Sequence, residues 1–127
     1  MKKEKYRIEY IFDKGSKNSL WNHITTPDGL AEWFADEVSL DGDQYIFTWN
    51  NSSETADQIG FSPLSYIRFR WQEEDDPKAF FEFRLSTIEL TGAIMLEIID
   101  FAEPDEKEHS ISLWESQVKD LKRSLGL

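Results

Sequence analysis

Residues 109–125 read HSISLWESQVKDLKRSL, and their apolar side chains recur every three or four positions. This spacing places the following residues along one stripe of an α-helix: Ile111, Trp114, Val118, Leu121 and Leu125. Ser112 and Glu115 have the spacing of a capping box, and Gly126 suits the end of a helix. We therefore predict one long helix from about Ser110 to Leu125, with Trp114, Val118 and Leu121 buried against a sheet.

Strands are predicted upstream of this helix, where apolar and polar side chains alternate with a period of two. The clearest run of alternating apolar residues is Tyr6, Ile8, Tyr10 and Phe12. Similar runs fill most of residues 37–101. The expected strands cover approximately residues 5–12, 37–40, 44–49, 54–61, 66–72, 79–86 and 92–101.

Two short helices are predicted between the first strand and the second. The first is expected over Lys17–Ile24, after a serine that can serve as its N-cap. Thr26 can cap a second helix that starts at Pro27, because proline is tolerated in the first turn. We expect this second helix to continue to Phe34, with Trp33 on its apolar stripe.

The order of elements is a strand, two short helices, six strands and one long helix, which defines an α+β protein. An antiparallel sheet of seven strands must bury one face, and the C-terminal helix is the only element large enough to cover it. We therefore predict a curved antiparallel sheet wrapped on that helix, in a single domain over residues 1–127. A chain of 127 residues is long enough for one such domain and too short for two of ordinary size.

Charge and composition exclude several classes of partner and site. The net charge is −11 and the sequence has no basic stripe, so we predict that the protein does not bind nucleic acid. The absence of cysteine rules out disulfides and thiolate metal sites. No apolar run approaches the roughly 18 residues that a membrane span needs, and no apolar signal segment follows the basic start. We therefore predict a cytoplasmic protein without a membrane span.

No catalytic set of residues is apparent in the sequence. His23 and His109 lack the ordered partners that a catalytic base requires, and we expect surface or capping roles for both. The acidic turn Glu73–Asp76 lacks the ligand spacing of a calcium loop, so we expect a solvated hairpin tip there. We predict a protein with no enzymatic activity, no metal and no cofactor.

Three stretches of the sequence carry a resemblance to a known family. Residues 20–34 read LWNHITTPDGLAEWF, a helix ending in threonine followed by a proline-started helix with a Trp-Phe pair. Residues 60–71, GFSPLSYIRFRW, have a strand–proline–strand pattern, and residues 113–122, LWESQVKDLK, form the helix with its leading tryptophan. In this order they resemble the START-like superfamily (Bet v 1-like, or SRPBCC). They are most similar to its branch related to the activator of the Hsp90 ATPase.

This resemblance implies the helix-grip fold and, commonly, a cavity for an apolar or amphipathic molecule. It does not imply one activity, because the superfamily includes lipid carriers, hormone-binding proteins, polyketide cyclases and chaperone activators. Our first hypothesis is non-enzymatic binding of a small hydrophobic or lipid-like ligand in a cavity between the sheet and the C-terminal helix. The alternative is a protein-interaction module of the Hsp90-activator type, with a chaperone partner and a filled cavity. Full-length Hsp90 activators carry a further N-terminal domain that these 127 residues lack, so the chaperone hypothesis ranks second.

Aromatic residues dominate the candidate ligand-binding set, in a chain with 9 Phe, 5 Trp and 4 Tyr. Rigid rings cannot fill a hollow as freely as leucine or methionine, so we expect a residual cavity next to Trp33 and Trp71. Core packing alone would require the same apolar residues on the inner face of the sheet. The predicted ligand-binding residues are Trp33, Phe47, Trp49, Phe69, Trp71, Phe81, Phe83, Trp114, Val118 and Leu121.

Charged residues on neighbouring strands form a second pattern, because Arg68, Arg70, Glu82 and Arg84 alternate with apolar residues. Cross-strand ion pairs on the solvent face are the expected arrangement. The alternative is that one arginine points into the cavity and holds a carboxylate or a headgroup.

Overall fold

Seven strands and three helices make up the computed structural model, which describes residues 2–127. Along the chain they are β1 (Glu4–Phe12), α1 (Lys17–Thr25), α2 (Pro27–Leu30), β2 (Glu37–Asp41), β3 (Gln44–Trp49), β4 (Ser52–Ser62), β5 (Tyr66–Trp71), β6 (Phe81–Thr87), β7 (Ile94–Ala102) and α3 (Lys107–Ser124). Each predicted strand is present, and two short helices follow the first one. The predicted α+β class is therefore confirmed.

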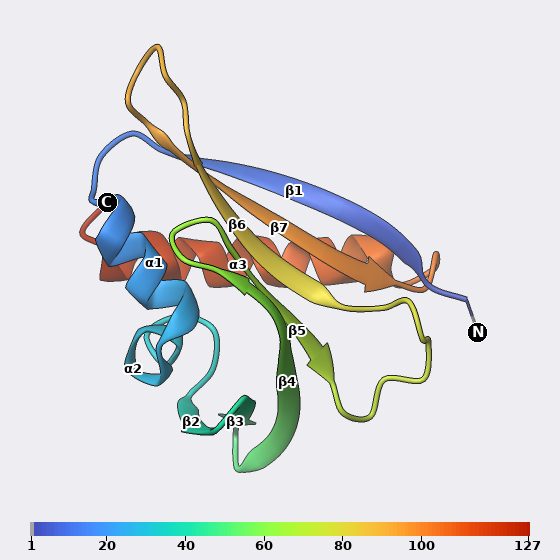
Figure 1. Ribbon diagram of the computed structural model, residues 1–127. Helices are drawn as coiled ribbons and strands as arrows, with labels where there is room; N and C mark the ends of the chain where they lie inside the picture. The colour runs from blue at the N-terminus through green and yellow to red at the C-terminus, as the bar shows by residue number, and fades with distance from the viewer. Residues whose placement is uncertain (1) are drawn as a thin grey trace.

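The strands form one antiparallel sheet in the order β1-β7-β6-β5-β4-β3-β2. From β2 to β7 each strand pairs with the next, and β1 pairs with β7 so that Tyr6 lies opposite Asp100. The sheet curves around α3, which runs across its inner face, while α1 and α2 lie near the C-terminal end of α3 (Figure 1). This arrangement confirms the predicted curved sheet wrapped on a C-terminal helix.

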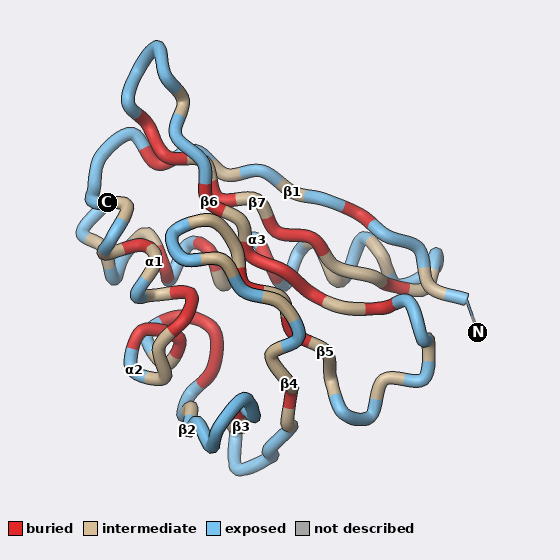
Figure 2. Tube along the Cα trace, viewed as in Figure 1, coloured by how far each residue is buried: buried red, intermediate tan, exposed pale blue. Residues whose placement is uncertain are grey.

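The alternation of β3, β5 and β6 turns most of their aromatic side chains toward α3. Buried residues follow the central strands and the segment that includes α2 (Figure 2). The deepest aromatic side chains, each with at most 1% of its surface exposed, are Phe47, Phe69, Phe81 and Phe83. Trp114, Val118 and Leu121 of α3 are buried, as predicted. Burying a large apolar side chain contributes roughly 1.5–3 kcal/mol, so this contact holds the helix on the sheet.

The start of α3 differs from the prediction, because the helix begins at Lys107 rather than near Ser110. Ser112 and Glu115 therefore lie inside the helix and form no capping box. Glu106 occupies the N-cap position and makes no side-chain cap hydrogen bond. The first turn, Lys107 to Ser110, has only charged and polar side chains, so it carries no apolar stripe from which its helical state could be predicted, although lysine and glutamate are good helix formers.

The end of α3 agrees with the prediction. Gly126 has a φ of 78° and its N–H donates to Arg123 O over 3.0 Å, while the N–H of Leu127 donates to Lys122 O over 2.8 Å. These two bonds form a Schellman motif, which requires a left-handed residue and therefore favours glycine. None of the helices within residues 2–127 is long and apolar enough to cross a membrane.

The second short helix is shorter than predicted. It ends at Leu30, and residues 31–34 form turns that bring the ring of Phe34 to 4.9 Å from that of Phe47, between centroids. At Gly29 the helix touches the backbone of α1, because a Cβ there would lie 2.2 Å from the carbonyl oxygen of Asn22. Glycine is therefore needed for this close approach. The turns after α2 were missed because the burial of Phe34 at the centre of the sheet depends on tertiary packing.

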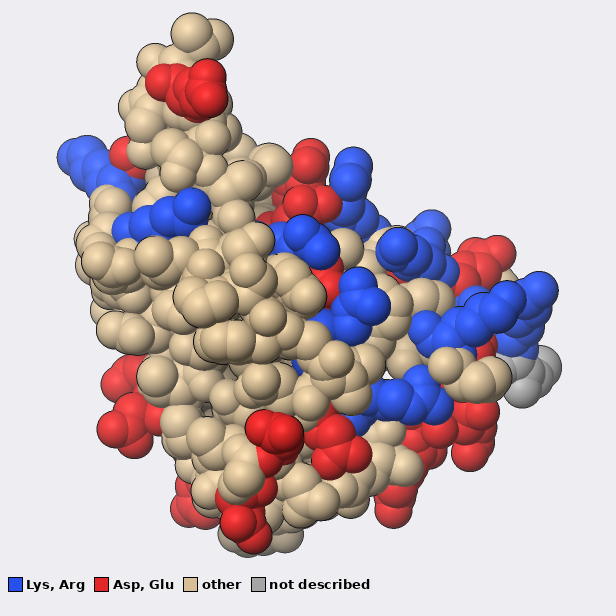
Figure 3. Space-filling view, in the orientation of Figure 1, with Lys and Arg blue, Asp and Glu red and all other residues tan. Residues whose placement is uncertain are grey.

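The outer face of the sheet carries the predicted ion pairs. Glu82 accepts hydrogen bonds from the Nε atoms of Arg68, over 2.7 Å, and of Arg84. The guanidinium carbon of Arg68 lies 3.9 Å from the ring centroid of Phe80, and that of Arg84 lies 4.6 Å from that of Tyr66. Figure 3 looks onto this face and shows Lys and Arg side chains gathered over it. The alternative that one of these two arginines enters the cavity is therefore wrong.

Candidate functional site

Phe34 lies at the centre of the inner aromatic cluster, although it is outside the predicted ligand-binding set. Its ring centroid is 4.9 Å from that of Phe47, 5.4 Å from that of Trp49 and 5.6 Å from that of Trp114. Stacked and edge-to-face pairs of this kind each contribute about 0.5–1.5 kcal/mol beyond their burial. The cluster therefore fills most of the space between the sheet and α3.

The predicted residues divide according to their depth in this cluster. Six of them have at most 2% of their surface exposed: Phe47, Phe69, Phe81, Phe83, Val118 and Leu121. All but Phe81 belong to the filled interior, whereas Phe81 also borders a pocket. Trp33 is also buried, with its ring centroid 5.4 Å from that of Phe83. Trp33 and Trp71 were expected to share one cavity, and in the structure they border different ones.

A cavity of about 160 Å³ remains where the inner face of the sheet meets the N-terminal half of α3. We call it the aromatic cavity. It is lined by Phe34, Trp49, Trp71, Phe81, Asp100, Ser110, Leu113, Trp114 and Gln117. Four predicted residues are thus brought together in its wall: Trp49, Trp71, Phe81 and Trp114. It is open to solvent beside the exposed side chain of Leu113, and its volume is smaller than the roughly 300–1,000 Å³ of common ligand pockets.

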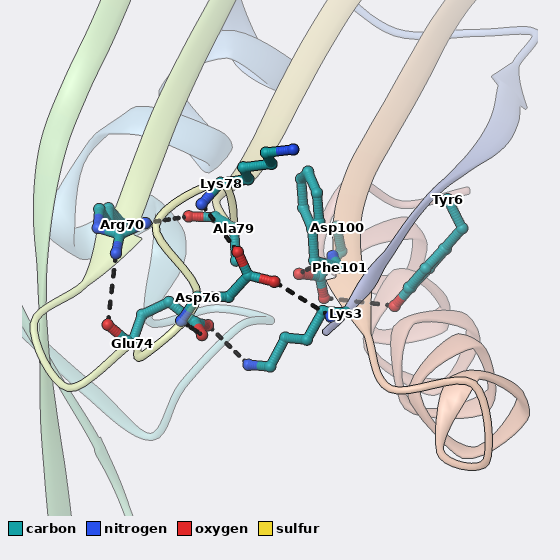
Figure 4. Close-up of polar contacts among 9 residues, drawn as sticks. All are labelled: Lys3, Tyr6, Arg70, Glu74, Asp76, Lys78, Ala79, Asp100 and Phe101. Carbon is teal, nitrogen blue, oxygen red and sulfur yellow. Dashed lines mark hydrogen bonds and ion pairs between the residues drawn. The ribbon is translucent and has the colours of Figure 1, made fainter. Parts of the chain in front are cut away.

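Asp100 supplies a carboxylate to the wall of the aromatic cavity. Its Oδ2 accepts hydrogen bonds from Trp114 Nε1 over 2.9 Å and from the Tyr6 hydroxyl over 3.3 Å. Its Oδ1 accepts from the N–H of Phe101 over 2.7 Å. Figure 4 shows the Tyr6 side chain pointing toward Asp100. Burial raises the pKa of Asp100 to about 6, against the opposing effect of these hydrogen bonds.

The donors around Asp100 are neutral groups. Burial and the nearby Asp100 charge raise the pKa of Tyr6 above its ordinary value, so its hydroxyl keeps its proton at neutral pH. That hydroxyl also forms a hydrogen bond with Ser110 Oγ. Among residues 2–127, no Lys, Arg or His side chain forms an ion pair with Asp100. The aromatic cavity therefore contains a carboxylate that is largely ionised at neutral pH and has only neutral hydrogen-bond partners.

Gln117 separates the aromatic cavity from a second hollow. Its Nε2 donates to the carbonyl oxygen of Phe34 over 2.9 Å, and Trp49 Nε1 donates to the same oxygen over 2.8 Å. Beyond this contact lies a hollow of about 420 Å³, which we call the acidic hollow. Its lining includes the carboxylates Glu32, Asp36 and Asp120. The acidic hollow is larger than the aromatic cavity, but its charged lining does not suit an apolar ligand.

The polar residues of the aromatic cavity were missed by the sequence analysis. The alternation of β7 could have indicated Asp100. Leu96, Ile98 and Asp100 are two positions apart and therefore face the same side of the sheet, and the first two are fully buried. A carboxylate at an inward position of an otherwise apolar strand is unusual and indicates a specific role. Ser110 and Gln117 are ordinary polar residues of an amphipathic helix, and no comparable signal marks them.

The acidic turn between β5 and β6 was predicted to be a solvated hairpin tip. In the structure it also contacts other parts of the chain. Lys3 Nζ lies 2.7 Å from Glu74 Oε1, and the Lys3 N–H donates to Asp76 Oδ2 over 3.1 Å. Arg70 donates to the carbonyl oxygens of Glu74 and Ala79 in the same turn (Figure 4). The turn thus binds the N-terminal segment beside β1, and Arg70 is engaged away from the aromatic cavity.

Histidine and acidic side chains elsewhere form no apparent reaction centre. His23 Nδ1 lies 2.8 Å from the carbonyl oxygen of Ser19, and its Nε2 lies 3.1 Å from Ser124 Oγ, so this residue links α1 to the end of α3. Within residues 2–127, no group of three or more His, Asp or Glu residues is arranged to hold a metal ion.

Comparison with known proteins identifies the family. The model of the START-like superfamily domain matches residues 1–127, and the chain belongs to this superfamily. A solution NMR structure of a Bacteroides fragilis protein is 42% identical, with a TM-score of 0.70, and the match covers 98% of this chain and 92% of that one. A comparison with the curated proteins finds no match.

Two more distant structures share the fold. The solution structure of the Aha1 dimer from Colwellia psychrerythraea is 21% identical, with a TM-score of 0.74, and 98% of this chain and 96% of that one are covered. A protein from the dynemicin biosynthetic locus is 18% identical, with a TM-score of 0.76, over 96% of this chain and 47% of that one. At these identities the two structures show the shared fold alone.

Proposed function

We propose that this protein binds a small hydrophobic ligand, about the size of one or two aromatic rings, in the aromatic cavity without transforming it. The observation that carries the proposal is a cavity of about 160 Å³ walled by the rings of Phe34, Trp49, Trp71, Phe81 and Trp114. Members of the START-like superfamily typically bind hydrophobic ligands, which supports this function.

The volume of the cavity restricts the ligand further than the sequence did. Lipid-like molecules were part of the first hypothesis, but a sterol or a long fatty acid needs a pocket of several hundred Å³. Within this proposal the ligand contacts Trp49, Trp71, Phe81 and Trp114. The deeper predicted residues, such as Phe69 and Phe83, hold those rings in position and do not touch the ligand.

The polar residues of the cavity wall support binding rather than catalysis. Asp100, Ser110 and Gln117 each form hydrogen bonds with other protein groups. Ser110 contacts the Tyr6 hydroxyl, whose raised pKa keeps it protonated at neutral pH and unable to accept a proton, so Ser110 lacks the activating base of a nucleophile. No reaction is therefore assigned to these groups.

The test is a titration followed by the indole N–H signals in two-dimensional NMR spectra. Toluene, indole and naphthalene should shift the signals of Trp49 and Trp114 saturably, while palmitate and cholesterol should not. Trp21 packs on Phe61, with ring centroids 5.6 Å apart, and does not line the aromatic cavity, so its signal is the internal control. The variant Trp71→Ala should weaken binding, and Trp21→Ala should leave it unchanged. If no member of the panel produces saturable shifts, the ligand-binding function is wrong.

A second candidate function is a protein-interaction module of the Hsp90-activator type. The filled interior favours it, as do three exposed apolar side chains on and beside the hairpin of β4 and β5: Ile59, Phe61 and Leu64. An ATPase assay with Hsp90 from the same organism would test this candidate. Stimulation that the pair Ile59→Ser and Phe61→Ser abolishes would favour the interaction module over ligand binding.

A further inference from the structure

Asp100, in the wall of the aromatic cavity, has no ion-pair partner among residues 2–127; the cation acting on it is Lys3, whose ammonium group is paired with Glu74 and lowers the Asp100 pKa only through its charge. An ionised group removed from water requires charge-assisted partners, and here Asp100 has only Tyr6, Trp114 and the Phe101 N–H. A carboxylate can accept about four hydrogen bonds, so three neutral donors leave acceptor capacity unused. Because Asp100 lines the aromatic cavity, a ligand there can use that capacity.

The rings around the cavity suit the same kind of ligand group. The faces of tryptophan and phenylalanine carry a partial negative charge and attract cations. Trp49, Trp71 and Trp114 line the cavity together with Asp100. The net charge of −11 and the carboxylates of the acidic hollow add a negative potential outside. A negatively charged ligand would meet unfavourable interactions from every one of these features.

We propose that the aromatic cavity selects small aromatic amines, with the ammonium group against Asp100 and the ring among Trp49, Trp71 and Trp114. This inference rests on the proposed function, because it names the chemical class of the ligand in the same cavity. The ammonium group donates to the carboxylate in a charge-assisted hydrogen bond. The hydrogen bond from Trp114 Nε1 to Asp100 Oδ2 then reports the occupancy of the site.

The experiment compares benzylamine, benzyl alcohol, toluene and benzoate, which have similar size and differ in the polar group. Affinities are measured at pH 7.5 by NMR titration, where Asp100 is ionised. We expect benzylamine to bind about tenfold more tightly than toluene, the ratio that one charge-assisted hydrogen bond supports. Benzoate should bind at least tenfold more weakly than toluene. Benzylamine should also shift the Trp114 indole signal further than toluene does.

Two variants separate a specific contact from general attraction by an acidic protein. Asp100→Asn should reduce the advantage of benzylamine over toluene to within about twofold, while the affinity for toluene is retained. Asp120→Asn removes one charge from the acidic hollow and serves as the matched control, so it should keep the advantage of benzylamine. If the two variants reduce that advantage equally, the attraction is general and the proposal is wrong.

The outcomes also distinguish this inference from the proposed function. If toluene and benzylamine bind the wild-type protein equally, the amine selectivity is wrong and the hydrophobic binding function stands. If none of the four compounds binds, both fail. The comparison of ligands in the wild-type protein decides the inference even if Asp100→Asn does not fold.

Discussion

Glu82 and Asp100 are carboxylates on the neighbouring strands β6 and β7, and they lie on opposite faces of the sheet. Glu82 on the outer face has no exposed surface and lies between two guanidinium groups, those of Arg68 and Arg84. Asp100 on the inner face has hydrogen bonds from neutral donors only. The first arrangement is complete within the protein, whereas the second leaves a charge that a ligand can neutralise.

The comparison shows that burial alone does not indicate the role of a charged group. A buried carboxylate with well-placed cations is a structural unit, because breaking it leaves an uncompensated charge. A largely buried carboxylate without an ion-pair partner has a raised pKa here, because the effect of burial exceeds that of its hydrogen bonds and of the Lys3 charge, and a raised pKa is a common property of functional sites. Each prediction below changes one of these two carboxylates or its partners.

The largest effect is expected when both cations of Glu82 are removed. The double variant Arg68→Met and Arg84→Met should lower the free energy of unfolding by about 3–5 kcal/mol, because Glu82 then stays buried without a partner. Urea denaturation followed by tryptophan fluorescence measures this loss. Adding Glu82→Leu should recover most of it. A loss below about 1 kcal/mol in the double variant would contradict a structural role for the arginines.

Asp100→Asn should raise the free energy of unfolding at neutral pH, whereas the arginine double variant lowers it. The folded-state pKa of Asp100 is about 6, against an ordinary value of 3.8, so between these values the folded protein binds more protons than the unfolded chain. The contribution of Asp100 to stability therefore falls as pH rises from 4 to 7. A shift of about two pKa units corresponds to at most about 3 kcal/mol.

The measurement is the difference in unfolding free energy between Asp100→Asn and the wild-type protein across this pH range. The difference should increase in favour of the variant from pH 4 to pH 7, because asparagine does not titrate. Comparing the two proteins at each pH cancels the titration of the other acidic groups. A difference that stays constant with pH would show that Asp100 titrates normally.

A smaller effect is expected for Trp114→Phe, which keeps an aromatic ring and removes the indole N–H. Asp100 then loses one donor, and the free energy of unfolding should fall by about 1–3 kcal/mol at pH 7.5. The midpoint of the Asp100 carboxyl titration, measured by carbon NMR, should move above about 6. An unchanged midpoint would show that this hydrogen bond does not stabilise the ionised form.

Tyr6→Phe should have the smallest effect. Its hydrogen bond to Asp100 is longer, at 3.3 Å, and the hydroxyl is shared with Ser110, so a loss of about 1 kcal/mol is expected. The Asp100 midpoint should move in the same direction as in Trp114→Phe, but less. Ser110→Ala provides the control, because it removes the second partner of the tyrosine and leaves its bond to Asp100 in place.

Much of the fold could be predicted from the sequence because period-two and period-3.6 patterns depend on which face of each element is buried. Trp114, Val118 and Leu121 were predicted to be buried on that basis, and they are. The start of α3 could not be found in this way, because its first turn from Lys107 to Ser110 contains no apolar side chain. A pattern of apolar residues carries no information where an element has only polar and charged ones.

The candidate site was less accessible to sequence reasoning. Phe69 and Trp71 alternate in the same phase of β5, yet Phe69 is fully buried whereas Trp71 borders the aromatic cavity. Which of them meets open space depends on how the sheet curves against α3, and that is set by tertiary packing. Asp100 was overlooked because its predicted strand, residues 92–101, has enough apolar residues to be covered on much of both faces, and no role was sought for the acidic residues in it.

The hydrogen bond between Gln117 and the Phe34 carbonyl has a consequence for ligand length. The aromatic cavity and the acidic hollow share Phe34, Trp49 and Gln117 in their walls, so a single side chain of α3 contributes to the boundary between them. Rotation of that side chain would break one hydrogen bond and withdraw the amide from the boundary, while Phe34 and Trp49 would remain in it. How far a ligand with a cationic tail could extend from the tryptophans toward the carboxylates outside therefore depends on three residues, of which Gln117 is the one on α3.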